Sequence, residues 1–168
     1  MSSRARSFFL LGCLAAGLAA GPDLRADVKV GDLFPALSPA ALGDGTIPKT
    51  TGDVVLVDFW ASWCAPCKAS FPAYARIQAD YAAKGLVIVA VSVDESFADY
   101  AGFIRKLSPP FATVRDLDQK LVSEVNVPTM PTSYLLGRDG RVRFVHVGFR
   151  GAETERAIRA EIDRLLAE

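Results

Sequence analysis

Two short apolar runs, residues 54–60 and 86–93, limit the folds that this chain can adopt. Both are rich in β-branched residues and have the length of buried strands. The residues between them, from about 66 to 83, predict a helix, because Pro66 suits a first helical turn and Gly85 suits the position after a helix end. A strand, a helix and a second strand in this order form a right-handed crossover between parallel strands. The sequence therefore predicts an α/β domain whose parallel strands are covered by helices.

The rest of the chain continues this alternation. We expect helices over residues 96–107, 117–125 and 152–167, and strands over 111–114, 133–136 and 142–147. A turn at 137–140 makes the last two strands an antiparallel hairpin. Near the N-terminus, the turn Gly43–Asp44–Gly45 predicts a second hairpin within residues 28–51. The predicted element order, βαβαβαββα, is that of a single domain.

Cys64 and Cys67 lie where the first strand passes into the first helix. The first turn of a helix has free N–H groups and a partial positive charge. A thiolate at this position is stabilised, which lowers the pKa of the thiol, and the thiolate is the form that attacks disulfides. One sulfur can attack a substrate disulfide, and the other can resolve the mixed disulfide. A structural disulfide is the alternative, but a bridge across two residues closes too short a loop to stabilise the fold much.

The first 26 residues have the layout of a secretory signal peptide. Arg4 and Arg6 precede an uncharged run over residues 8–20, which is shorter than the roughly 18 apolar residues of a spanning helix. An uncleaved anchor is the alternative, and lipidation of Cys13 is disfavoured because the apolar stretch before it is very short. We therefore expect a domain over residues 27–168, exported to the periplasm or a similar compartment, that keeps only Cys64 and Cys67.

Composition disfavours several other classes of function. Lys plus Arg and Asp plus Glu both number 19, so the net charge gives no support for binding to nucleic acid or to an acidic membrane surface. The single histidine, His146, argues against a histidine-based metal site and against a Cys–His protease. We expect no cofactor, no resident metal and a monomer.

Residues 57–68, with the sequence VDFWASWCAPCK, resemble the active-site signature of the thioredoxin superfamily, and in particular the exported TlpA/ResA-like thiol–disulfide oxidoreductases. Pro72 resembles the proline that kinks the first helix of that family, and Met130–Pro131–Thr132 resembles its cis-proline loop. Residues 31–35 resemble the start of the domain, and residues 96–107 resemble a helix inserted in this branch. The resemblance implies a thioredoxin-like α/β fold, a central mixed sheet flanked by helices, with an N-terminal hairpin and a central helix insertion.

The resemblance also implies roles for single residues. Cys64 would be the exposed nucleophile, Cys67 the buried resolving thiol, and Pro131 a cis-proline that places the backbone of Met130 beside the sulfurs. The substrate-binding residues would be Trp63, Ala65, Pro66, Met130 and Pro131. The implied activity is exchange with protein disulfides, reduction being favoured over oxidation, with electrons from a donor in the membrane or the periplasm.

Asp58 is a polar residue inside an apolar strand, six residues before Cys64. Burial raises the pKa of a carboxyl group, and a carboxyl group near Cys67 can accept its proton. The resemblance implies the same role for Asp58. Many TlpA/ResA-like members have a glutamate where this chain has Ser70, and thioredoxins tend to have a lysine where it has Ala90. Asp58 is therefore expected to be the only carboxyl group that serves the site.

Two other functions fit part of this pattern. The thiolates of Cys64 and Cys67 and the thioether of Met130 are soft ligands that suit Cu(I), so a copper-binding or metallochaperone-like module is the alternative. A peroxidase of the peroxiredoxin type needs Thr or Ser three residues before its cysteine, and Ala61 occupies that position before Cys64. Peroxidase chemistry is therefore disfavoured.

Overall fold

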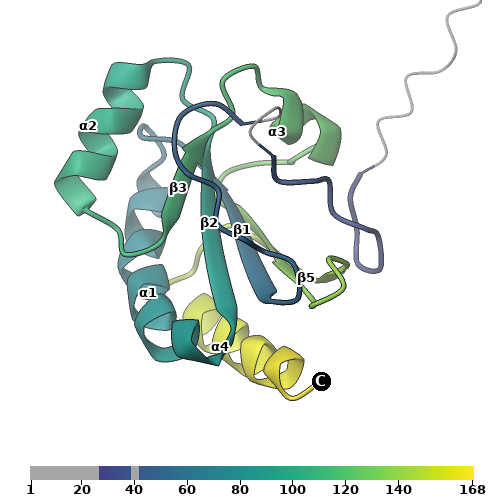
Figure 1. The fold of residues 1–168 in the computed structure, drawn as a ribbon. Coiled ribbons are helices and arrows are strands. Elements are labelled where there is room, and N and C mark those ends of the chain that lie inside the picture. Colours follow the sequence, from purple (N-terminus) through teal and green to yellow (C-terminus); the bar gives the residue numbers. More distant parts are fainter. Residues whose placement is uncertain (1–26, 39–41) are drawn as a thin grey trace, which may run out of the picture.

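The fold is built on one five-stranded mixed sheet (Figure 1). The computed structural model describes residues 27–38 and 42–168. The predicted signal peptide, with Cys13, lies outside the described residues. The strand order is β3-β2-β1-β4-β5, with β1 at Val54–Trp60, β2 at Leu86–Ser92, β3 at Ala112–Arg115, β4 at Thr132–Leu136 and β5 at Val142–Val147.

The pairing of the strands confirms the predicted parallel strands and the predicted final antiparallel hairpin. β1 pairs with β2, and β2 with β3, in parallel, whereas β1–β4 and β4–β5 are antiparallel. Every residue of β1 is buried, as expected for a central strand that is covered on both faces. The carboxyl end of β1 and the amino end of β4 therefore meet at the same edge of the sheet, where the cysteine motif begins.

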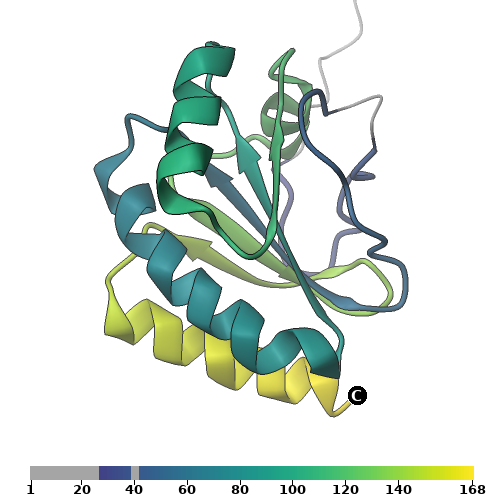
Figure 2. The same cartoon turned by 60° about the vertical axis from the view of Figure 1, so that its left-hand side comes forward.

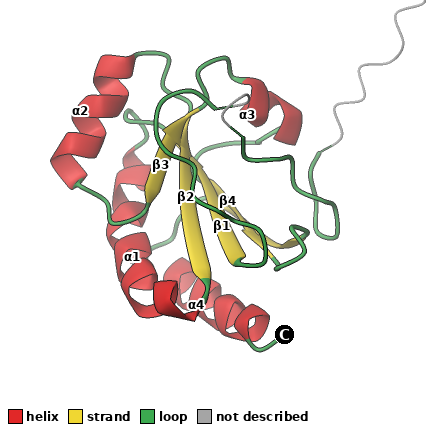
Figure 3. Cartoon of the chain, in the orientation of Figure 1, coloured by secondary structure: helices red, strands yellow, loops and turns green. Residues whose placement is uncertain are grey.

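Helices cover both faces of the sheet (Figure 3). Their bounds are α1 Ala65–Tyr81, the 3-10 turn η1 Ala82–Lys84, α2 Phe97–Leu107, α3 Lys120–Val125 and α4 Ala152–Leu166. The element order matches the prediction, and Ser96 caps α2 by accepting a hydrogen bond from the Asp99 N–H. The helices α1 and α4 run side by side on one face, as both views of the ribbon show (Figure 2).

The predicted N-terminal hairpin is wrong for the part of residues 28–51 that the structure describes. Its only bridges there join Leu33 to Arg141 and Gly45 to Val114 of β3, rather than two segments of the extension to each other. Gly45 has φ +107°, and an added Cβ would lie 2.2 Å from the Thr113 carbonyl oxygen. The glycine is therefore needed for close approach to β3 rather than for a tight hairpin turn.

Several element boundaries also differ from the prediction, most of them by one residue. β3 begins at Ala112, one residue late, and α3 begins at Lys120 rather than at 117. The cause of the later helix start is Asp116, which is fully buried and accepts hydrogen bonds from the N–H groups of residues 120, 121 and 122. Its carboxylate satisfies the first free donors of α3 and so sets the start of that helix.

An aromatic cluster fixes α1 and α2 against the end of β1. Trp60 is fully buried, with ring centroids 4.5 Å from Phe103 of α2 and 5.0 Å from Phe71 of α1. Each buried aromatic side chain contributes on the order of 2–3 kcal/mol of transfer free energy. Trp60 is thus a core residue that packs α1 and α2 against the carboxyl end of β1.

Among the described residues, no helix combines the length and the apolar character that a membrane span requires.

Candidate active site

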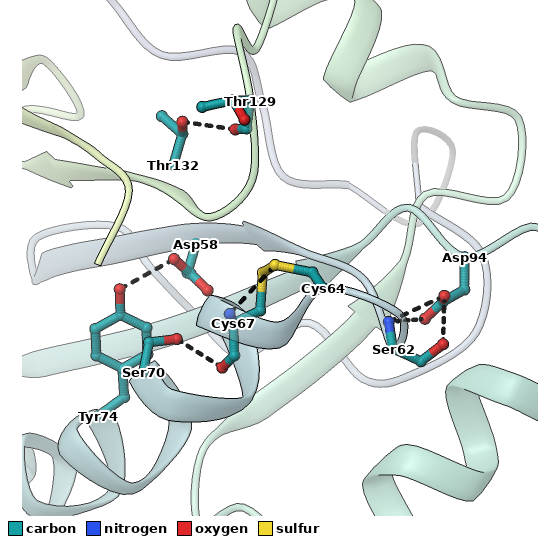
Figure 4. Close-up of a disulfide and its surroundings, with 9 residues drawn as sticks. All are labelled: Asp58, Ser62, Cys64, Cys67, Ser70, Tyr74, Asp94, Thr129 and Thr132. Atoms are coloured by element: carbon teal, nitrogen blue, oxygen red, sulfur yellow. Dashed lines mark hydrogen bonds between the residues drawn. A yellow bond between two sulfur atoms is a disulfide. The ribbon is translucent and has the colours of Figure 1, made fainter. Parts of the chain in front are cut away.

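The two cysteines form a disulfide at the junction of β1 and α1 (Figure 4). Cys64 is the N-cap of α1, and its Sγ accepts a hydrogen bond from the Cys67 N–H at 3.2 Å. This sulfur therefore occupies the end of the helix where free N–H groups favour a negative charge. The expected exposure of Cys64 is wrong for the disulfide form, because only 5% of the residue is exposed, against 0% of Cys67. Cys64 is nevertheless the more exposed of the two cysteines, as predicted.

A buried carboxylate holds the loop that leads into Cys64. Asp94, at the carboxyl end of β2, accepts hydrogen bonds from the Ser62 N–H at 3.0 Å and the Ser62 hydroxyl at 2.8 Å. Its second oxygen also accepts a hydrogen bond from the Ser92 hydroxyl. The Arg115 guanidinium donates to the carbonyl oxygens of residues 94 and 95, which fixes the chain beyond the carboxylate. These contacts order Ser62, two residues before Cys64.

Asp58 lies in the middle of β1 and is fully buried. The Tyr74 hydroxyl of α1 donates to Asp58 Oδ1 at 3.0 Å, whereas Oδ2 has no hydrogen-bond partner among the described residues. Burial raises the pKa of Asp58 well above its usual value, and the hydrogen bond from Tyr74 opposes that shift only in part. The predicted burial and the predicted direction of the pKa shift are therefore confirmed.

Asp58 is the one buried carboxyl group that retains an unpartnered oxygen in the described part of the chain. The other two, Asp94 and Asp116, accept hydrogen bonds on both oxygens. Ser70 is buried and donates its hydroxyl hydrogen to the Cys67 carbonyl, so it adds no acid to the site. Ala90 is the β2 partner of Asp58 in the sheet register, which confirms the predicted lack of a lysine there.

The predicted cis-proline loop lies at the same edge of the sheet. The peptide bond between Met130 and Pro131 is cis, as expected. Thr132 pairs with Phe59 of β1, so Pro131 comes next to the carboxyl end of β1, the end that leads to Cys64. The Thr132 hydroxyl donates to the Thr129 carbonyl oxygen at 2.7 Å and closes this loop (Figure 4). Met130 is half-buried, and Pro131 is buried.

The other predicted substrate-binding residues are on the surface. Trp63 is 71% exposed, which is unusual for a large aromatic side chain, and both Ala65 and Pro66 of the first turn of α1 are exposed. Trp63 and Ala65 flank Cys64 directly in the chain, and Pro66 follows Ala65. They give the largely buried sulfur an apolar rim.

Sequence reasoning missed the roles of Tyr74, Ser62 and Asp94. The apolar pattern places Tyr74 on the buried face of α1 but indicates no role for its hydroxyl. Its position seven residues after Cys67 places both side chains on one face of the helix, two turns apart, and this spacing is the signal that the sequence offers. For Asp94 the signal is its position directly after a buried parallel strand, at the edge where β1 also ends.

The described residues contain no group of three or more His, Cys, Asp or Glu side chains arranged to hold a metal ion. The chemistry that the arrangement offers comes from two sulfurs, one buried carboxyl group and a tyrosine hydroxyl. Together these groups can exchange a pair of electrons and a proton.

A family model described as thioredoxin-like matches residues 52–142, which is more than half of the chain. Thiol-disulfide oxidoreductase ResA of Bacillus subtilis (strain 168) is 34% identical over 97 residues, covering 58% of this chain and 54% of the relative. The chain thus spans about half the length of the curated relatives it matches. The names of these relatives confirm the ResA-like resemblance.

Solved structures agree with this placement. A Chlorobium tepidum protein, named as a candidate thiol:disulfide interchange protein DsbE, is 40% identical with a TM-score of 0.67, covering 70% of this chain and 82% of that one. StoA from Bacillus subtilis is 26% identical with a TM-score of 0.57, covering 64% of this chain and 82% of that one. The thioredoxin-like fold predicted from the sequence is therefore confirmed.

Proposed function

Because this chain belongs to the thioredoxin-like family, we propose that it is a thiol–disulfide oxidoreductase that acts on protein disulfides through Cys64 and Cys67. The observation that carries the proposal is the Cys64–Cys67 disulfide at the N-terminus of α1, beside the loop with the cis bond at Pro131. A stabilising disulfide would not need an N-terminal helix position or an exposed apolar rim. Both features instead favour reaction with a second molecule.

In the proposed reaction the reduced protein attacks with the Cys64 thiolate. The N–H groups of the first turn of α1 stabilise this thiolate, as the hydrogen bond from the Cys67 N–H to Cys64 Sγ indicates. A substrate sulfur leaves, and a mixed disulfide with Cys64 forms. Cys67 then attacks Cys64 Sγ, which restores the internal disulfide and releases the second substrate thiol. Asp58 accepts the proton of Cys67 in this second step.

The substrate would lie over the rim of Trp63, Ala65 and Pro66 and against the loop of Met130 and Pro131. The rim is exposed and apolar, and the loop leads into β4 at the same edge of the sheet. The backbone of Met130 would then pair with an extended substrate segment, as a short strand pairs with a sheet edge. Alanine at Trp63 would weaken binding of a peptide disulfide without changing the internal disulfide.

We further propose that residues 27–168 act as an exported domain and reduce substrates with electrons from a separate donor. Compartment is tested by the N-terminal sequence and location of the protein isolated from its own cell. Direction is tested by equilibrating the dithiol with redox buffers of known potential. A potential close to that of reducing thioredoxins supports reduction, and one close to that of strong oxidants overturns it.

The decisive experiment compares Cys67→Ser with Cys64→Ser, a matched pair in which one sulfur is lost in each. Both reduced variants are mixed with a peptide that contains one disulfide, and adducts are measured by mass spectrometry. Cys67→Ser should accumulate a mixed disulfide at Cys64, because the resolving thiol is absent. Absence of that adduct, together with no reduction of the peptide by the unchanged protein, would overturn the proposal.

A further inference from the structure

We propose that Tyr74 is a positioning residue of the site: its hydroxyl holds one oxygen of Asp58 and leaves the other free to exchange a proton with Cys67. This inference rests on the role proposed above for Asp58. It assigns the Tyr74 hydroxyl, two helical turns after Cys67 on α1, a part in the proton transfer.

The geometry of the hydrogen bond supports a well-defined contact between Tyr74 and Asp58. The Tyr74 hydroxyl donates to Asp58 Oδ1 at 3.0 Å, and both residues are at most 1% exposed. The Tyr74 ring is held by edge contacts with Phe111 and Phe149, whose centroids lie 6.4 Å and 6.1 Å away. A ring packed in this way fixes its hydroxyl, so the bonded carboxyl oxygen is fixed as well.

The free oxygen is the one available for proton transfer. Asp58 Oδ2 has no partner among the described residues, although a buried carboxyl oxygen without a hydrogen bond is costly. In Figure 4 this oxygen lies on the Cys67 side of the carboxyl group, opposite the bond to Tyr74. Cys67 and Tyr74 belong to the same face of α1 because they are seven residues apart. Tyr74 therefore orients the Asp58 carboxyl group, and the free oxygen of that group can exchange a proton with Cys67.

No other charged group of the described chain competes for Asp58. Its register partners are Ala90 of β2 and Ser133 of β4, neither of which titrates. Helix α4 also packs against β1, but its Glu155 and Arg159 pair with Arg76 and Asp80 of α1. The titratable groups of α1 on this face are Cys67, Tyr74 and Tyr81. The Tyr81 ring lies two turns beyond Tyr74, against Lys84 and Arg159. Burial and the bond from Tyr74 thus determine the pKa of Asp58, the first raising it and the second lowering it.

The proton and the electrons balance in the resolving step. The sulfur of Cys67 attacks Cys64 Sγ, the bond between Cys64 and the substrate sulfur breaks, and the internal disulfide forms. The proton of Cys67 moves to Asp58 Oδ2, and the substrate leaves as a thiolate that takes a proton from water. The substrate disulfide gains two electrons over the two steps, and the two cysteines lose them.

Tyr74→Phe removes the hydroxyl and keeps the ring contacts with Phe111 and Phe149. The Asp58 carboxylate then loses the only hydrogen-bond donor that the described residues give it, so the pKa of Asp58 rises further. Loss of a charge-assisted hydrogen bond of ordinary strength should move the midpoint by about 1–2 pH units. The rate of resolution depends on ionised Asp58 and therefore increases with pH. The midpoint of this increase should move to higher pH by the same amount, about 1–2 pH units. At a pH below the wild-type midpoint, resolution should slow about tenfold for each pH unit by which the midpoint moves.

The experiment measures resolution of a mixed disulfide in a single turnover. Reduced protein is mixed with a peptide that contains one disulfide, and release of the second thiol is followed from about pH 5 to 9. The matched control is Tyr100→Phe, which removes the hydroxyl bonded to the Thr113 carbonyl and leaves Asp58 untouched. Asp58→Asn is measured in parallel as the reference for the role of the carboxyl group.

The outcomes separate the two proposals. Three results together support the inference. The resolution rate no longer increases with pH in Asp58→Asn, the midpoint of the increase moves to higher pH in Tyr74→Phe, and that midpoint is unchanged in Tyr100→Phe. A changed Asp58→Asn with an unshifted Tyr74→Phe overturns the role of Tyr74 alone. An unchanged Asp58→Asn overturns the role of Asp58 and that of Tyr74 with it. If Tyr74→Phe does not fold, a ring-fluorinated tyrosine is placed at position 74, because it is a stronger hydrogen-bond donor of similar size. This residue should move the midpoint of the rate increase to lower pH. An unchanged midpoint overturns the inference.

Discussion

Replacement of Asp58 by asparagine should remove one pH-dependent contribution from the stability of the oxidised protein. The pKa of Asp58 is raised by burial in the folded state, whereas an unfolded aspartate titrates near its ordinary value of about 3.9. Between these two values the folded protein binds up to one proton more than the unfolded chain. The contribution of Asp58 to the free energy of unfolding therefore falls as the pH rises through this window, and this contribution is greatest below the unfolded pKa.

The expected slope follows from one proton. Across the window, the wild-type free energy of unfolding should fall by up to about 1.4 kcal/mol per pH unit relative to that of Asp58→Asn. Asparagine keeps a carbonyl oxygen for the Tyr74 hydroxyl but cannot ionise. Any cost of its amide group adds a constant offset, because that cost does not depend on pH.

The assay is urea unfolding of both proteins between about pH 3 and 9, with the Cys64–Cys67 disulfide intact so that neither cysteine titrates. The quantity plotted is the difference in unfolding free energy, wild type minus variant. It should fall with pH and then level off above the folded pKa. A difference that is flat, or that rises with pH, would refute the reasoning that burial dominates at Asp58.

Three further substitutions test other parts of the account. Asp94→Ala leaves the N–H and the hydroxyl of Ser62 without their buried acceptor. The free energy of unfolding in urea should fall by roughly 2–4 kcal/mol, and disulfide exchange should slow. Unchanged values would show that this carboxylate does not order the loop. Trp63→Ala should change stability by less than about 0.5 kcal/mol, because the side chain is 71% exposed, yet raise the KM for a peptide disulfide several-fold; an unchanged KM removes Trp63 from the proposed rim. Gly45→Ala should destabilise by about 1–3 kcal/mol, because its Cβ would meet the Thr113 carbonyl at 2.2 Å, and a neutral result in thermal unfolding would contradict the close approach to β3.

The regular elements were predictable because each follows from local pattern. The runs that became β1 and β2 are apolar on both faces, and Ser96 and Gly85 mark a helix start and a helix end. The N-terminal segment was not predictable, because Gly45 has the sequence signature of a turn but serves a contact with β3, far along the chain. Local propensity carries no information about such a pairing.

The site was predictable in its sulfurs and its buried acid, and less so in what surrounds them. Cys64, Cys67 and Asp58 could be identified from spacing and from polarity inside a strand. The contact between Tyr74 and Asp58 joins positions 16 residues apart, and that between Ser62 and Asp94 joins positions 32 apart. Both depend on how α1 and β2 pack against β1. The low exposure of Cys64 likewise follows from packing around the disulfide.

The measurement that tests the central claim most directly is the pH dependence of thiol alkylation in the fully reduced protein. Iodoacetamide labelling at Cys64 and Cys67 is followed separately by peptide mass spectrometry. Cys64, at the N-terminus of α1, should be labelled first, with a midpoint below the value of about 8.5 for a free cysteine, and Cys67 should react more slowly at each pH. Faster labelling of Cys67, or a Cys64 midpoint at or above that of a free cysteine, would contradict the assignment of Cys64 as the attacking thiol.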